Sequence, residues 1–152
     1  MLWKWSNDFS VASGRGGITR LPVAQAVGAM FATPGDAQGA QYILTGQTTN
    51  LVTLNLLGPA VPVSGAIAFS AVVSAKAFGD FSGGFEVKGM ISNYGGSVGF
   101  IGTPTVTVLG RDSATLNVTA LVSGSRLALQ VTGITLLSVR WVATLRTSEV
   151  VF

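Results

Sequence analysis

The stretch Ser138-Val-Arg-Trp-Val-Ala-Thr-Leu-Arg146 indicates the fold class, because apolar and polar residues alternate along it. In an extended chain its apolar positions share one face: Val139, Trp141, Ala143 and Leu145. The opposite face carries charged and hydroxyl side chains: Arg140, Thr144 and Arg146. A period of two residues is typical of a strand that buries one face. The stretch therefore predicts a half-buried strand with Trp141 in the core.

The same period continues upstream to Gln41. It predicts seven further strands over residues 42–45, 51–57, 66–76, 85–91, 105–109, 115–122 and 126–132. Turn signals separate them, and Ser123-Gly-Ser125 is a good hairpin connection. No helix of normal length competes, so we expect an all-β chain, either an antiparallel β-sandwich or a jelly-roll-like barrel. The expected companions of Trp141 in the core are Leu116, Val118, Leu127 and Leu129.

Residues 1–40 differ in character from the rest. They are rich in glycine and alanine, and they show no strand alternation. Pro22, Gly28 and Pro34 discourage a helix longer than one turn near residues 24–30. The sequence predicts an extended N-terminal arm and irregular connector over residues 1–40, followed by one sandwich domain over residues 41–152.

Charged residues make up only 10% of the 152-residue chain, against about 25% in an average protein. A freely diffusing monomer normally covers itself with charge, because exposed apolar patches promote association. We therefore expect a homo-oligomer or an assembly component. The absence of cysteine and histidine removes disulfides, the usual zinc ligands and the usual proton shuttle.

Composition also argues against several partners. The net charge is +3, but the basic residues are scattered, so we expect no nucleic-acid binding. The first residues lack the apolar core of a secretory signal, and no run of about 18 apolar residues predicts a membrane span. We therefore expect synthesis in the cytoplasm and no contact with a membrane.

Three patterns invite a chemical interpretation, and we favour a structural one for each. Asp80 and Glu86 lie six residues apart, a spacing that could suit the paired carboxylates of a glycosidase. We favour instead an aspartate in a solvated loop and a surface glutamate that pairs with Lys88. Gly14-Arg-Gly-Gly17 lacks the lysine and the following helix of a phosphate loop. Asp36 and Asp112 have no second acid within a few residues to hold calcium. We expect no catalytic residues, no cofactor and no metal.

Two tryptophans stand at the N-terminus, in Met1-Leu-Trp-Lys-Trp5. Aromatic side chains are favoured anchors at interfaces, so Trp3 and Trp5 predict either an arm anchored in a neighbouring subunit or a segment folded back on its own domain. Arg15 and Arg20 fit an acidic partner surface. These four residues are the candidate assembly interface.

Several segments together resemble a known group of proteins. They are Pro34-Gly-Asp-Ala-Gln38 through Gln41-Tyr-Ile-Leu44, Val87-Lys-Gly-Met90, Ile101-Gly-Thr-Pro-Thr-Val-Thr-Val108, Arg126-Leu-Ala-Leu-Gln-Val-Thr-Gly133 and Val139-Arg-Trp-Val-Ala-Thr-Leu-Arg-Thr-Ser-Glu-Val150. Over residues 34–150 the chain resembles small structural proteins of tailed-bacteriophage virions, often described as fibre or structural modules. It departs from them at Ser92-Asn-Tyr-Gly-Gly-Ser97, which is glycine-rich where they tend to carry charge and alanine.

The resemblance implies a place on the virion surface more firmly than a particular role. The leading hypothesis is a capsid decoration, or cement, protein that binds the major capsid protein or other virion proteins as a homotrimer. The alternative is a tail appendage or receptor-binding fibre module that contacts a host glycan. A glycan-cleaving enzyme is the third hypothesis, and the shortage of acid pairs counts against it.

Overall fold

The computed structural model describes residues 37–50 and 52–152, and every regular element in them is a β-strand. The strands are β1 (Ala37–Thr49), β2 (Thr53–Ala60), β3 (Gly65–Ala77), β4 (Ser82–Tyr94), β5 (Ser97–Phe100), β6 (Thr105–Arg111), β7 (Asn117–Ser123), β8 (Arg126–Thr132) and β9 (Ser138–Val151). The all-β prediction is confirmed. No helix within these residues is long and apolar enough to cross a membrane.

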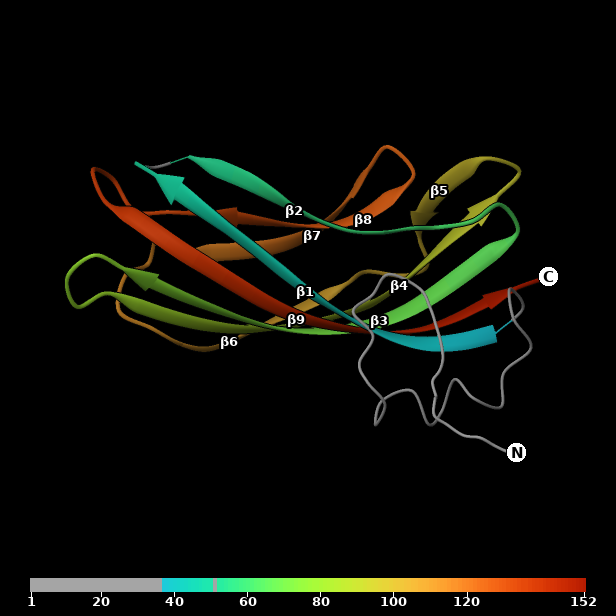
Figure 1. Cartoon of the computed structure of the whole chain (residues 1–152), viewed down its shortest axis with the longest axis horizontal. Coiled ribbons are helices and arrows are strands. Elements are labelled where there is room, and N and C mark those ends of the chain that lie inside the picture. The colour runs from blue at the N-terminus through green and yellow to red at the C-terminus, as the bar shows by residue number, and fades with distance from the viewer. Residues whose placement is uncertain (1–36, 51) are drawn as a thin grey trace, which may run out of the picture.

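The strands form two antiparallel sheets that pack face to face (Figure 1). The larger sheet, sheet A, has the order β1-β9-β3-β4-β5, and β6 also pairs with β4. The smaller sheet, sheet B, has the order β2-β8-β7. The described strands thus make a sandwich, as expected, and do not close into the barrel that was the other expectation.

The predicted strands differ from the observed ones mainly in length. β8 has the predicted bounds, Arg126–Thr132, whereas β9 extends five residues beyond Arg146 to Val151. β1 runs for 13 residues around the four that were predicted. β5 was not predicted. The arm and connector expected over residues 1–40 lie largely outside the described residues, so the proposed domain boundary stays a prediction.

Alternation decides which side chains enter the space between the sheets. In β3, every second residue from Gly65 to Ala77 is buried, and in β9 the same holds from Val139 to Thr147. β9 lies between β1 and β3 and pairs with both along its length. Because residues opposite one another in neighbouring strands share a face, these buried positions form continuous rows across sheet A.

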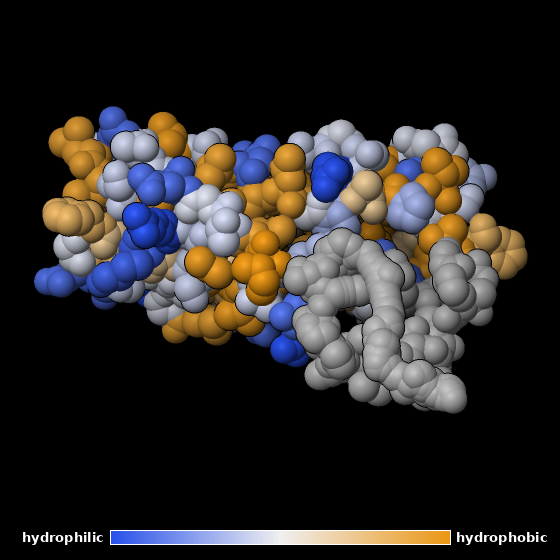
Figure 2. Space-filling view, in the orientation of Figure 1, coloured by the Kyte–Doolittle hydropathy of each residue, from blue (hydrophilic) through white to orange (hydrophobic). Residues whose placement is uncertain are grey.

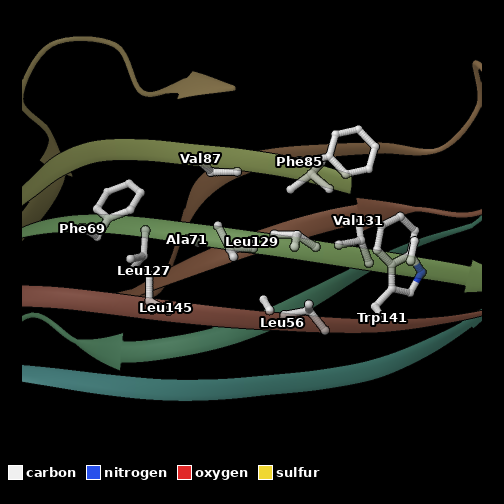
Figure 3. Packing of buried hydrophobic residues seen from close by; sticks show 14 of the residues in the cluster. Leu56, Phe69, Ala71, Phe85, Val87, Leu127, Leu129, Val131, Trp141 and Leu145 are labelled. Atoms are coloured by element: carbon white, nitrogen blue, oxygen red, sulfur yellow. The ribbon is translucent and has the colours of Figure 1, made fainter. Parts of the chain in front are cut away.

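Trp141 lies in the core with 1% of its surface exposed, as predicted. Its expected companions belong to the same buried cluster: Leu116, Val118, Leu127 and Leu129. Phe85 lies beside it, with ring centroids 6.4 Å apart, and Figure 3 shows Val131 of β8 close to the indole. The cluster joins both sheets, so one core holds the sandwich together.

The indole nitrogen of Trp141 does not lose its hydrogen bond on burial. Nε1 donates to the hydroxyl of Thr48 on β1 at 3.0 Å, and Thr48 is itself buried. Close by on β1, Gly46 lets sheet B approach: a Cβ there would lie 2.5 Å from Leu54 Cδ2 and 2.8 Å from Leu56 Cδ2. The hydrogen bond between Trp141 and Thr48 and the absence of a side chain at Gly46 thus allow close packing at this edge of the core.

Candidate binding surface at one end of the sandwich

The sequence-predicted interface residues Trp3, Trp5, Arg15 and Arg20 lie outside the described residues, as does Asp36. Their roles stay predictions. The other acidic residues considered for chemistry lie within the described part, and the structure places each of them.

Glu86 lies on the outer face of sheet A, where its Oε2 is 3.4 Å from Lys88 Nζ. This is the surface pair expected from the sequence. Asp80 lies in the turn between β3 and β4. Asp112 Oδ2 accepts a hydrogen bond of 3.1 Å from the backbone N–H of Ser82, so it ties the chain after β6 to the start of β4. No group of three potential metal-ligating acids, histidines or cysteines occurs among the described residues.

A polar cluster lies at the margin of the inner face, between β1 and β9. Tyr42 donates to Glu149 Oε2 at 3.0 Å, and Thr147 donates to the same oxygen at 2.8 Å. Burial raises the pKa of the Tyr42 phenol above its usual range, and the charge of Glu149 raises it further. Arg126 acts in the opposite direction. The phenol thus stays protonated and serves as a hydrogen-bond donor, which is a structural role.

Two large apolar side chains stand out at one end of the sandwich. Phe78, in the turn between β3 and β4, is 83% exposed, and Leu136, in the loop between β8 and β9, is 81% exposed. Phe81 adds further apolar surface to the same turn. Residues 78–81 and 133–137 together are called the loop end below. Figure 1 shows both segments at the left of the molecule, and Figure 2 shows hydrophobic residues gathered there.

Backbone hydrogen bonds connect the two segments of the loop end. Phe78 N–H donates to the carbonyl of Ser138 at 3.1 Å, which links the β3–β4 turn to the start of β9. Within the turn, Ala77 N–H donates to the carbonyl of Phe81 at 2.9 Å. The loop end is therefore an extension of the paired strands β3 and β9, and Phe78 is displayed on a fixed backbone.

Asn50, just after β1, holds the second segment from the other side. Its Oδ1 accepts a hydrogen bond of 2.8 Å from Leu136 N–H, and its own N–H donates to the carbonyl of Leu137 at 3.0 Å. Asn50 and Leu136 have φ angles of 67° and 62°. Asparagine tolerates this left-handed region, but for leucine it costs roughly 1–2 kcal/mol. The fold thus holds an exposed leucine in a strained conformation, a combination that often marks a functional position.

Basic residues border the loop end on the outer face of sheet A. Lys76 and Arg140 are directly opposite one another on β3 and β9. Lys76 Nζ donates to Ser82 Oγ at 3.3 Å. Two like charges at opposing positions disfavour the sheet slightly. The loop end therefore combines an apolar tip with a basic border.

Sequence reasoning did not single out this surface. The available signal was a large apolar residue inside each expected turn, in Lys76-Ala-Phe-Gly-Asp80 and in Thr135-Leu-Leu-Ser138. An apolar residue in a turn can be exposed, as Phe78 and Leu136 are, although Ile134 and Leu137 of the second loop pack into or against the core. That the two turns and Asn50 meet could not be read from the sequence, because the contacts join distant segments.

Comparison with known proteins gives little further guidance. No family model matches the sequence, and no curated protein matches it. Among solved structures, the chain is similar to the tailspike protein gp49 of the Acinetobacter baumannii bacteriophage Fri1, a capsular polysaccharide depolymerase. The identity is 13% and the TM-score 0.43, and the match covers 93% of this chain and 25% of that one. The chain thus spans about a quarter of the tailspike's length, and a similarity at this level does not assign that protein's activity to it.

Proposed function

We propose that the chain is a structural module of a bacteriophage tail appendage and that its loop end contacts the host cell surface. The observation that carries this proposal is the display of Phe78 and Leu136, each more than four fifths exposed, on loops braced by hydrogen bonds. Contiguous exposed apolar surface marks interaction sites, and binding residues are commonly carried on loops held by a rigid scaffold. The resemblance of residues 34–150 to virion modules supports the phage origin.

We favour the tail over the capsid as the location of this chain on the particle. The decoration hypothesis rested in part on an arm containing Trp3 and Trp5, which lies outside the described residues. Within residues 37–50 and 52–152, no feature favours a capsid shell as the partner. An end of the sandwich that presents a fixed apolar tip fits an appendage, because such a module must reach outward from the particle and touch another surface.

We propose binding rather than cleavage at this surface. Glu86 is paired with Lys88 on the outer face of sheet A, and Asp112 is engaged with the backbone of Ser82. The loop end offers apolar contact and positive charge. Apolar anchors of this kind supply affinity, and a charged border supplies orientation and association rate. The acidic or phosphorylated glycans of a bacterial surface suit such a border.

The location is tested by labelling particles with gold-conjugated antibody against the full chain and imaging them by negative stain. We expect label on the tail. Label on the head shell would contradict the appendage and return the decoration hypothesis to first place. Incubating the purified full chain with host polysaccharide, and measuring new reducing ends, checks the absence of cleavage separately.

A further inference from the structure

β6 is an exposed strand at the edge of sheet A. All seven of its residues are exposed, although the strand is paired with β4 over most of its length. Val106 and Val108 are opposite Val87 and Phe85, which are fully buried. They therefore point to the core side of the sheet, yet 37% and 44% of their surface is exposed. The apolar inner face of sheet A thus extends beyond the area that sheet B covers.

The unequal width of the two sheets explains this exposure. Sheet B has three strands and ends at β7, which contacts β4 and β5. The inner face of β6 lies beyond that limit. Burying a valine side chain removes apolar surface from water and is favourable. An additional layer or strand at this edge would therefore complete the core of the sandwich.

The backbone of β6 is also open on one side. Among the described strands, β6 pairs with β4 and with no other. Every second N–H and C=O group of an edge strand faces away from its single neighbour, which leaves a template for another strand. Pro104 precedes the strand, and a register irregularity follows Val108 opposite Phe85 and Gly84, so the open segment is Thr105–Val108 with its immediate neighbours.

Charge does not protect this edge. No charged residue lies between Lys88 and Arg111 in the sequence. Edge strands of monomeric proteins commonly carry lysine or other charges that oppose pairing with a second chain. Two copies of the segment Thr105–Leu109 could meet with no repulsion between their own side chains.

The sequence of β6 is complementary to itself. In an antiparallel pair centred on Thr107, Thr107 faces Thr107 of the other copy, and Val106 faces Val108. This register places valine against valine on the core side, and on the outer side it places Thr107 against Thr107 and Thr105 against Leu109, because opposing residues share a face. A shift by one residue would set valine against threonine. The core side of one copy would then lie on the same side of the joined sheet as the outer side of the other copy.

We propose that two copies of this chain associate through β6, antiparallel and centred on Thr107, to form one continuous sheet. The inference rests on the uncovered inner face over Val106 and Val108 and on the uncharged segment Thr105–Leu109 of the edge strand. It concerns β6 and holds whatever the loop end binds. The two-fold contact differs from the trimer expected from the sequence, which no observation on the described residues tests.

The test uses sedimentation equilibrium of the full-length chain and its variants over a range of concentrations. We expect the parent to be a dimer. Thr107→Glu would place two carboxylates opposite each other and beside Glu86, so it should weaken the dimer about tenfold or more. Ser74→Glu adds the same charge to the same outer face, on β3, and should leave the dimer unchanged.

A mixing experiment makes the test specific for the proposed register. Thr107→Lys and Thr107→Glu chains, mixed in equal amounts, should form a heterodimer tighter than either variant forms alone. Thermal unfolding confirms that each variant is folded before it is mixed. A parent that is monomeric or trimeric, a dimer that tolerates Thr107→Glu, or a mixture with no gain in affinity would overturn the proposal.

Discussion

The N–H of Leu136 donates a hydrogen bond of 2.8 Å to the side-chain oxygen of Asn50, a residue 86 positions earlier in the chain. This bond joins the connection after β1 to the connection before β9. It holds Leu136 at a φ of 62° while the side chain points into solvent. The conformation of Leu136 within the loop end therefore depends in part on one carboxamide.

Asn50→Gly should loosen the loop end without straining residue 50. Glycine tolerates the positive φ of this position but removes the acceptor, so the change isolates the hydrogen bond. A bond of about 1 kcal/mol corresponds to roughly a fivefold change in local opening. Hydrogen exchange of the Leu136 amide should accelerate by that factor. Asn50→Asp keeps an acceptor and is the control. Equal exchange in the glycine variant and the parent would show that the loop is held by other contacts.

Trp141→Ala should destabilise the sandwich severely. The side chain is 1% exposed, and its loss leaves a cavity beside Phe85 and removes the donor for Thr48. Truncation of a buried aromatic costs about 3–5 kcal/mol in the free energy of unfolding. Urea denaturation measures this loss. Val142→Ala, one position along on the outer face, should cost far less, and equal losses for the two variants would refute the assignment of the faces.

Gly46→Ala should destabilise the protein although it adds only a methyl group. The new Cβ would lie 2.5 Å from Leu54 Cδ2, so β2 must shift or the leucine must leave its rotamer. Overpacking of this kind costs about 1–3 kcal/mol. Gly99→Ala is the matched control, because a Cβ at that position would meet nothing within 4 Å beyond its chain neighbours. Thermal unfolding should give Gly46→Ala a lower melting temperature than Gly99→Ala. Similar melting temperatures would mean that the two sheets are not in close contact at β1.

The Tyr42 phenol should make stability depend on pH in the alkaline range. Burial and Glu149 raise its pKa in the folded state, whereas in the unfolded chain the pKa is about 10. The stabilisation from the neutral phenol is therefore complete below pH 10 and declines as the pH rises further. Tyr42→Phe should be less stable than the parent at pH 8, by about 1 kcal/mol for the lost hydrogen bond. Denaturant titrations from pH 8 upward should show this difference shrinking beyond pH 10, and a constant difference would contradict the assignment.

How far the sequence predicts this fold depends on the kind of signal. The sequence predicted the strands that have a regular period of two, and it predicted the burial of Trp141, because alternation alone indicates which residues face the core. β5 escaped prediction because Tyr94-Gly-Gly-Ser97 has the composition of a loop, although Val98 and Phe100 pack against the core. The length of β1 also escaped, since glycine and glutamine interrupt its apolar pattern.

The candidate site required the structure. The contact between Asn50 and Leu136 and the contact between Phe78 and Ser138 depend on strand order, with β9 inserted between β1 and β3. Strand order is set by packing of the whole core and leaves no local mark on the sequence. The exposed state of Val106 and Val108 depends on where sheet B ends, which is likewise a property of the assembled sandwich. By contrast, the surface pairing of Glu86 with Lys88 was predictable, because the two lie on one face of a single strand.

The most direct test of the central claim measures binding of the labelled full-length chain to intact host cells. Phe78→Ser combined with Leu136→Asn removes the apolar tip, and asparagine suits the positive φ of position 136. Val72→Ser combined with Val142→Ser removes exposed apolar surface from the outer face of sheet A instead. If the loop end contacts the host, the first variant binds at least about tenfold more weakly than the parent, as loss of central anchors predicts, and the second binds like the parent. Undiminished binding by a folded Phe78→Ser/Leu136→Asn chain would contradict the account.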